Sequence, residues 1–70
     1  MTNEQFLQGM GKKVREIRRS KSISLNKMVQ LSGIHKSSLS ELENGKRNSY
    51  SLTLKTIADI LEVEVSDFFI

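Results

Sequence analysis

Cysteine and proline are absent from this 70-residue sequence, and histidine occurs only once, at His35. Without cysteine neither a disulfide nor a thiolate metal site can form, and a single histidine cannot build a zinc site. We therefore expect no metal and no cofactor. A chain of this length buries only about 60% of the surface that its unfolded form exposes. Its stability must then come from packed helices or from association with a second copy.

Long apolar runs are also missing. No segment approaches the roughly 18 apolar residues of a membrane span. The amino end, MTNEQFLQGM, lacks the basic start and the apolar stretch of a signal peptide. We expect a cytoplasmic protein with no membrane partner.

Groups suited to catalysis are equally scarce. The sequence has no cysteine nucleophile and no glycine-rich phosphate loop. Glu41 and Glu43 lie two positions apart in a predicted helix, so their carboxylates point in different directions and cannot act as a pair. We therefore expect that the protein is not an enzyme.

Positive charge is confined to one part of the chain. All 11 lysines and arginines lie in residues 1–55, and the formal net charge of the chain is +3. The last fifteen residues carry no base, and their acids are Asp59, Glu62, Glu64 and Asp67. This asymmetry predicts a basic face for a polyanion and a separate acidic end. An ordinary solvated surface would fit the charge alone equally well.

Apolar residues recur at steps of three and four along nearly the whole chain, as the buried stripes of helices require. The pattern predicts helices over residues 6–17, 25–31, 36–43 and 52–61, with a final helical turn within 63–70. The alternation in residues 61–68, LEVEVSDF, would fit a strand, but no second strand is available to pair with it. The predicted fold class is all-α, in a single domain over residues 1–70.

The first helix contains two glycines near its start. Thr2 or Asn3 can serve as its N-cap. Gly9 and Gly11 each cost about 1 kcal/mol inside a helix. We therefore expect the regular part of this helix to begin near Gly11.

Two of the predicted helices are short and closely spaced. Ser24 is well placed as the N-cap of the first, and Gly33 ends it. The second begins near Lys36 and stops at Asn44-Gly45. A tight turn between two helices is the geometry of a helix-turn-helix, here over about residues 24–43.

The second of these helices has one face of short polar side chains. On a helical wheel its outward residues are Lys36, Ser37, Ser40, Glu41 and Asn44, opposite Ser38, Leu39 and Leu42. A face without large apolar residues can lie against the floor of a groove, whereas long apolar residues would predict a protein partner.

The major groove of B-DNA accepts one α-helix and shows a distinct pattern of donors and acceptors for each base pair. Lys36 can donate to guanine, Ser37 and Ser40 can bond to several base edges, and Glu41 can accept from cytosine. Phosphates could be held by residues at the ends of the two helices. These residues are Ser24, Lys27, Asn44, Lys46 and Arg47.

Four motifs give the chain a resemblance to a known family. They are V-R-E-I-R (14–18), I-S-L-N-K-M-V-Q-L-S-G-I (23–34), L-S-E-L-E-N-G-K-R-N (39–48) and I-A-D-I-L-E-V-E-V-S-D-F-F (57–69). With them, residues 10–69 resemble the Cro/C1-type (XRE) helix-turn-helix family of phage repressors and bacterial regulators. The resemblance implies a compact five-helix bundle of the lambda repressor-like kind, which binds operator DNA as a homodimer.

The same resemblance implies roles for individual residues. Lys36, Ser37, Ser40 and Glu41 become the base-facing set, and Ser24, Asn44, Lys46 and Arg47 become contacts to the DNA backbone. It also implies that Arg18 pairs with Glu43 and locks the first helix to the recognition helix.

The sequence departs from the family pattern at four positions. Leu25 stands where the family often has a glutamine that touches DNA, so we expect Leu25 to pack against the protein instead. His35 is a poor N-cap for the recognition helix. Glu62 replaces a common helix-ending glycine, and Glu64 replaces the small cap of the last helix.

Phe68, Phe69 and Ile70 form an apolar end to the sequence. One of them should fill the core, and the remaining surface suggests a dimer contact, in line with the family's use of its last helix. The alternative is that all three complete the core of a monomer.

We therefore expect a homodimeric transcriptional regulator, acting as a repressor, that binds double-stranded DNA at an inverted-repeat operator. The alternative is a protein-interaction module, such as an antitoxin or co-regulator, with a regulatory protein as its partner. The basic residues Lys36, Lys46 and Arg47 around the polar face favour DNA.

Overall fold

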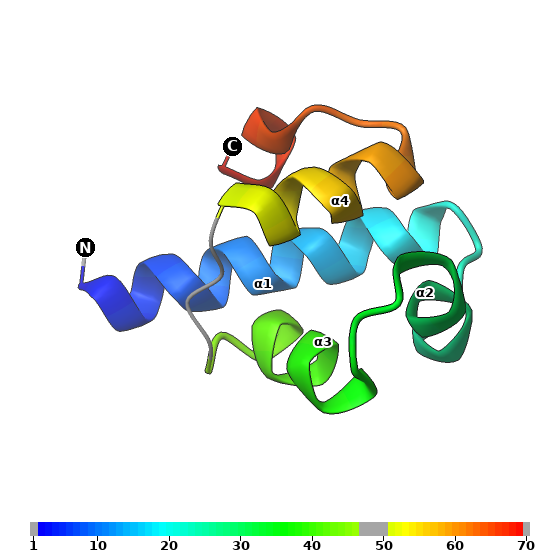
Figure 1. Ribbon diagram of the computed structural model, residues 1–70. Coiled ribbons are helices and arrows are strands. Elements are labelled where there is room, and N and C mark those ends of the chain that lie inside the picture. Colours follow the sequence, from blue (N-terminus) through cyan, green and yellow to red (C-terminus); the bar gives the residue numbers. More distant parts are fainter. Residues whose placement is uncertain (1, 47–50, 70) are drawn as a thin grey trace.

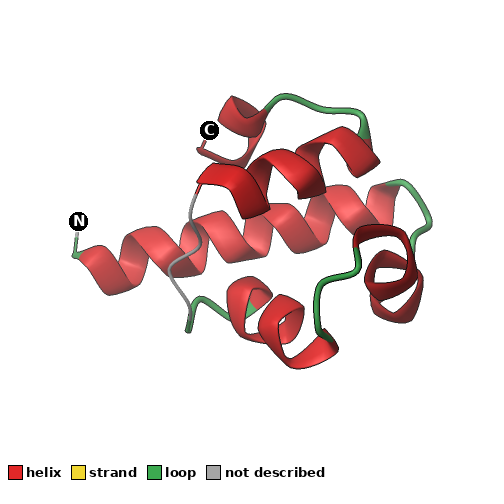
Figure 2. Ribbon diagram, in the orientation of Figure 1, coloured by secondary structure: helices red, strands yellow, loops and turns green. Residues whose placement is uncertain are grey.

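The computed structural model describes residues 2–46 and 51–69. These residues form α1 (Asn3–Ser20), α2 (Leu25–Ser32), α3 (Lys36–Glu43), α4 (Ser51–Leu61) and a 3-10 helix, η1 (Val65–Phe69). Figure 1 shows α1 running through the middle of the molecule, with α3 on one side in this view and α4 and η1 on the other. Helices and loops make up the whole described part of the chain, without a strand (Figure 2). The all-α prediction is therefore confirmed.

The expected five-helix bundle needs correction, because the last element is a 3-10 helix and not a fifth α-helix. The Asp67 N–H donates to the Glu64 carbonyl at 2.9 Å, and the Glu64 N–H donates to the Asp67 carboxylate at 3.0 Å. These reciprocal bonds span three residues and close the tight turn of a 3-10 helix. Glu62, which precedes this turn, has a φ of 59° and takes the left-handed conformation that glycine adopts more easily.

The first helix begins at Asn3, so the expectation that it becomes regular only near Gly11 is wrong. A capping box holds its start: the Gln5 N–H donates to the Thr2 hydroxyl at 3.1 Å, and the Thr2 N–H donates to the Gln5 amide oxygen at 2.9 Å. Because the box satisfies N–H groups of the first turn, the helix continues through both glycines despite their low propensity.

The turn between α2 and α3 has the predicted boundaries. The Ser24 hydroxyl caps α2 by accepting from the Lys27 N–H at 3.0 Å, and Gly33 ends α2 in the left-handed conformation with a φ of 72°. His35 is the N-cap residue of α3, but its side chain makes no capping hydrogen bond. The position of α3 is therefore set by its packing and by its C-terminal end.

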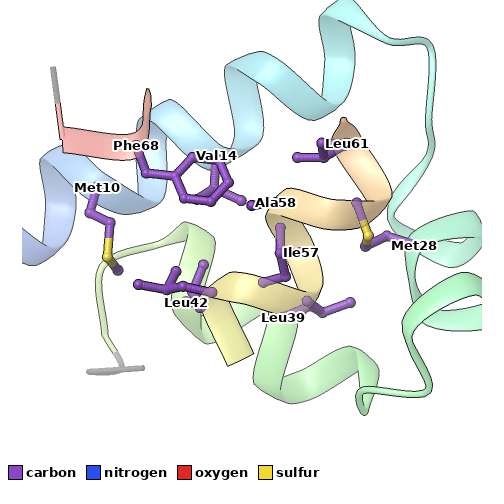
Figure 3. Packing of buried hydrophobic residues seen from close by; sticks show 10 residues of the cluster. Met10, Val14, Met28, Leu39, Leu42, Ile57, Ala58, Leu61 and Phe68 are labelled. Carbon is purple, nitrogen blue, oxygen red and sulfur yellow. The ribbon is translucent and has the colours of Figure 1, made fainter. Parts of the chain in front are cut away.

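The core lies between the helices and draws on all four α-helices and η1 (Figure 3). Its buried apolar residues are Met10, Val14, Met28, Leu39, Leu42, Leu54, Ile57, Ala58, Leu61 and Phe68. Full burial of one such large side chain stabilises the fold by roughly 1.5–3 kcal/mol. Leu25 is half-buried and packs against this cluster, as expected for a residue that replaces a polar contact.

The apolar end of the chain divides between core and surface. Phe68 reaches into the core and is only 1% exposed, so it cannot contribute to the predicted dimer contact. Phe69 is 46% exposed and stacks on Phe6 of α1, with ring centroids 5.5 Å apart. Ile70 lies outside the described residues. Among the helices of the described residues, none has the length and apolar character to cross a membrane.

Candidate nucleic-acid interface

The predicted recognition helix, α3, has the two faces that the sequence predicts. Leu39 and Leu42 are each 1% exposed and fix the inner face in the core. The outer face presents exposed Lys36, Ser37 and Glu41 together with half-buried Ser40. No large apolar residue lies on that face, so the backbone of α3 can come close to a flat or grooved surface.

The cationic and hydroxyl groups at the helix ends are placed at the surface. Ser24, Lys27 and Lys46 are all exposed. The Ser24 hydroxyl accepts from a backbone N–H of α2, as described above, so its oxygen already has one partner. Arg47, a predicted phosphate contact, lies outside the described residues.

The C-terminal end of α3 is closed by a Schellman motif. The Gly45 N–H donates to the Leu42 carbonyl at 3.1 Å, and the Lys46 N–H donates to the Glu41 carbonyl at 2.8 Å. Gly45 has the left-handed φ of 72° that this motif requires. The motif fixes the direction in which the chain leaves α3, and it holds the backbone of Lys46 in place.

Arg18 and Glu43 form a buried ion pair between α1 and α3. The Arg18 guanidinium donates from Nε to Glu43 Oε2 at 2.7 Å and from Nη2 to Glu43 Oε1 at 2.9 Å, a two-bond geometry. Its Nη1 also donates to the Ile23 carbonyl at 2.8 Å, which ties down the turn before α2. The hydrogen bonds to Glu43, and the attraction between the two charges, raise the pKa of Arg18 despite its burial.

Arg15 belongs to the same contact, although the sequence argument does not single it out. Its Nη2 donates to the Asn44 amide oxygen at 2.8 Å, and its Nε lies 3.4 Å from Glu43 Oε1. The side chain of Asn44, predicted as a phosphate contact, is thus exposed but already bonded to the protein. The spacing of Arg15 and Arg18, one helical turn apart, is the signal that could have identified both as facing α3.

Two glycines allow α1 and the end of α3 to approach closely. A Cβ atom on Gly11 would lie 2.2 Å from the Leu42 carbonyl oxygen, and one on Gly45 would lie 2.6 Å from Gln8 Cα. Gln8, Gly11, Arg15 and Arg18 therefore follow one stripe of α1, at steps of three and four residues, along which residues 42–45 lie. We call this set the α1 stripe.

The surface around α3 presents hydrogen-bonding groups and positive charge. The part of the chain that the structure describes has no group of three or more histidine, cysteine or carboxylate residues able to hold a metal ion. His35 is exposed at the start of α3.

Comparison with known proteins supports the resemblance. A family model described as a helix-turn-helix domain matches residues 11–69. The HTH-type transcriptional regulator RghRB of Bacillus subtilis (strain 168), itself uncharacterized, is 37% identical over 54 residues, which are 76% of this chain. The chain spans 39% of the length of that relative.

Solved structures share the arrangement of helices. The restriction-modification controller protein C.AhdI from Aeromonas hydrophila is 30% identical, with a TM-score of 0.85 over 90% of this chain and 96% of that one. An HTH_3 family transcriptional regulator from Vibrio cholerae is 32% identical, with a TM-score of 0.87 over 97% of this chain and 38% of that one. The chain therefore belongs to the XRE-type helix-turn-helix family of DNA-binding transcriptional regulators.

Proposed function

We propose that this chain is a sequence-specific repressor of transcription that binds an inverted-repeat operator in double-stranded DNA as a homodimer. Each copy would place α3 in the major groove of one half-site. The observation that carries this proposal is the outer face of α3, where short polar side chains stand over a firmly buried inner face of Leu39 and Leu42.

The proposed base contacts follow from the chemistry of that face. Lys36 lies in the first turn of α3, the part of a recognition helix that enters a groove most deeply. Its ammonium can donate to guanine, and the Glu41 carboxylate can accept from cytosine. Ser37 and Ser40 are short enough to let the helix backbone approach the base edges.

The proposed phosphate contacts lie at the ends of the two helices. Lys27 is in the first turn of α2, where the backbone N–H groups and the helix dipole also favour an anion. Lys46 follows α3, with its backbone held by the Schellman motif. Such contacts fix register and orientation on the duplex, and the bases supply the sequence preference.

The proposed dimer uses the exposed aromatic pair of Phe6 and Phe69. Each residue is 46% exposed, and the two stacked rings form an apolar surface between the start of α1 and the end of η1. Figure 1 shows η1 and α3 on different sides of α1, so pairing through η1 leaves α3 open to DNA. The subunit measures 32 × 22 × 20 Å, which suits the spacing of about 34–36 Å between successive half-sites.

Repression follows from occupancy, because a dimer bound to an operator excludes other proteins from the same DNA. The names of the similar proteins support a regulatory role, since they include a controller protein and transcriptional regulators.

Selection of bound sequences from a random duplex pool tests the proposal directly. We expect an inverted repeat whose half-sites lie one helical turn apart on one face of the duplex. Recovery of no preferred sequence, together with capture of another protein through α3, would replace DNA recognition with the protein-interaction alternative.

Two single variants then separate the roles of the basic residues. Lys36→Ala should relax preference at particular base pairs, at a cost of about 1–3 kcal/mol there. Lys46→Ala should weaken binding to all sequences alike and lower the salt slope by about one unit. If Lys46→Ala changed base preference while Lys36→Ala did not, the assignment of roles would be wrong.

A further inference from the structure

The side chain of Asn44 connects α1 to the base-facing surface of α3. Its amide oxygen accepts from Arg15 Nη2 at 2.8 Å. Its amide nitrogen donates to the Ser40 carbonyl at 2.9 Å and lies 3.4 Å from the Ser40 hydroxyl oxygen. A continuous set of contacts therefore runs from Arg15 through Asn44 to Ser40, one of the proposed base contacts.

Hydrogen-bond chemistry allows only one orientation of the Asn44 amide. A guanidinium has donors only, so the atom that faces Arg15 must be the amide oxygen. A backbone carbonyl has lone pairs only, so the atom that faces the Ser40 carbonyl must be the amide nitrogen. Both neighbours require the same orientation, and Arg15 is the neighbour that lies outside α3.

This orientation affects the Ser40 hydroxyl. A hydroxyl can donate one hydrogen bond and accept two. Because the Asn44 N–H₂ group faces the Ser40 oxygen, the hydroxyl hydrogen turns away from it. One of the two lone pairs of Ser40 is then occupied while its hydrogen points outward, which favours the acceptors of guanine, adenine and thymine over the cytosine amino group.

We propose that Arg15 is a specificity-determining positioning residue, which acts through Asn44 to present Ser40 to DNA as a hydrogen-bond donor. This inference rests on the proposed function, because it gives Arg15, which would lie outside the major groove, a part in the recognition of bases by α3. It predicts that the wild-type protein discriminates against cytosine at the base position that faces Ser40.

The position of Arg15 suits an indirect role. The residue sits in α1 on the α1 stripe, where its guanidinium is partly buried against Glu43 and Asn44. Its side chain is 37% exposed, so a direct contact to phosphate is the competing explanation. The two roles differ in what they change: a phosphate contact alters affinity for every sequence, whereas the role proposed here alters preference at one base position.

The test compares base preferences of the full chain and its variants in selections from one random duplex pool. Ser40→Ala first identifies the base position that Ser40 reads, since preference should change there. Arg15→Ala and Asn44→Ala should each relax discrimination against cytosine at that same position, by roughly 2- to 12-fold, the value of one hydrogen bond. Arg19→Ala removes an exposed cation from the same helix and is the matched control, with no expected change of preference.

The possible results separate this inference from the proposed function. A change confined to the Ser40 position in Arg15→Ala, and its absence when Ser40→Ala is already present, supports the inference. A uniform loss of affinity with unchanged base preferences overturns it and leaves the proposed function in place. If the wild-type chain selects no sequence at all, both are overturned. Circular dichroism checks folding, and Asn44→Ala carries the test if Arg15→Ala is unfolded, because Asn44 is exposed.

Discussion

Gly9 and Gly11 lie in the same helix, yet alanine should have opposite effects at the two positions. A Cβ at Gly11 would lie 2.2 Å from the Leu42 carbonyl oxygen and 2.8 Å from the Glu43 carbonyl oxygen. A Cβ at Gly9 would meet no atom within 4 Å. Because the atoms around Gly11 are backbone atoms, α1 and α3 must separate until the shortest contact grows from 2.2 Å to at least 3.0 Å.

The size of the effect follows from three contributions. Overpacking of this kind costs about 1–3 kcal/mol, and the separation also stretches the 2.7 Å contact of Arg18 with Glu43. Alanine is favoured over glycine in a helix by about 1 kcal/mol, which offsets part of the cost at Gly11 and acts alone at Gly9. We expect Gly11→Ala to lower the free energy of unfolding by about 2 kcal/mol. Gly9→Ala should raise it by about 0.5–1 kcal/mol.

Urea denaturation followed by circular dichroism measures both changes against the wild type. A domain of this size has a total stability of roughly 4–10 kcal/mol, so shifts of this size move the midpoint clearly. Gly9→Ala is the control for helix propensity, because it makes the same substitution in the same helix. If both variants shifted stability in the same direction, the close approach of α1 to the end of α3 would be refuted.

The remaining predictions concern the ion pair and the aromatic end. Arg18→Met leaves the buried Glu43 carboxylate with only its longer contact to Arg15, at 3.4 Å, and should cost about 3–5 kcal/mol in urea denaturation. Arg18→Met combined with Glu43→Leu should recover much of that loss. Because the pKa of Arg18 is raised above its ordinary value, its contribution is complete below that ordinary pKa and is lost only as pH rises through the folded pKa. The cost of Arg18→Met should therefore be the same at about pH 7 and pH 10, and a decline over this range would contradict the assignment. Phe69→Ser should convert the proposed dimer to a folded monomer in analytical ultracentrifugation, because this ring lies at the surface; an unchanged dimer would place the interface elsewhere.

Local signals in the sequence account well for the ends of the helices. Ser24 and Gly33 act within a few residues of their own positions, so their roles as caps can be predicted without knowledge of the fold. The faces of α3 are equally local, because the 3.6-residue period places Leu39 and Leu42 on one side. The Arg18–Glu43 contact joins residues 25 positions apart, and here the family resemblance rather than periodicity supplied the expectation.

The role of Gly11 could not be predicted in this way. From the sequence near Gly11, only the unfavourable helix propensity of glycine can be predicted. The advantage of glycine at this position is the close approach to α3, which exists only in the folded chain. The same holds for Phe68 and Phe69. Both residues are phenylalanine, so the sequence alone does not distinguish them, and the turn of η1 decides which side chain enters the core.

The α1 stripe explains why the stability of this fold and its base preference in DNA binding should be linked. A helix of eight residues, such as α3, is too short to be stable in water by itself. Its orientation therefore comes from the burial of Leu39 and Leu42 and from the contacts of its C-terminal end with Gly11, Arg15 and Arg18. A substitution in α1 that shifts this end by a fraction of an ångström also shifts the outer face of α3. Changes of base preference should thus arise from residues in α1 that never touch a base.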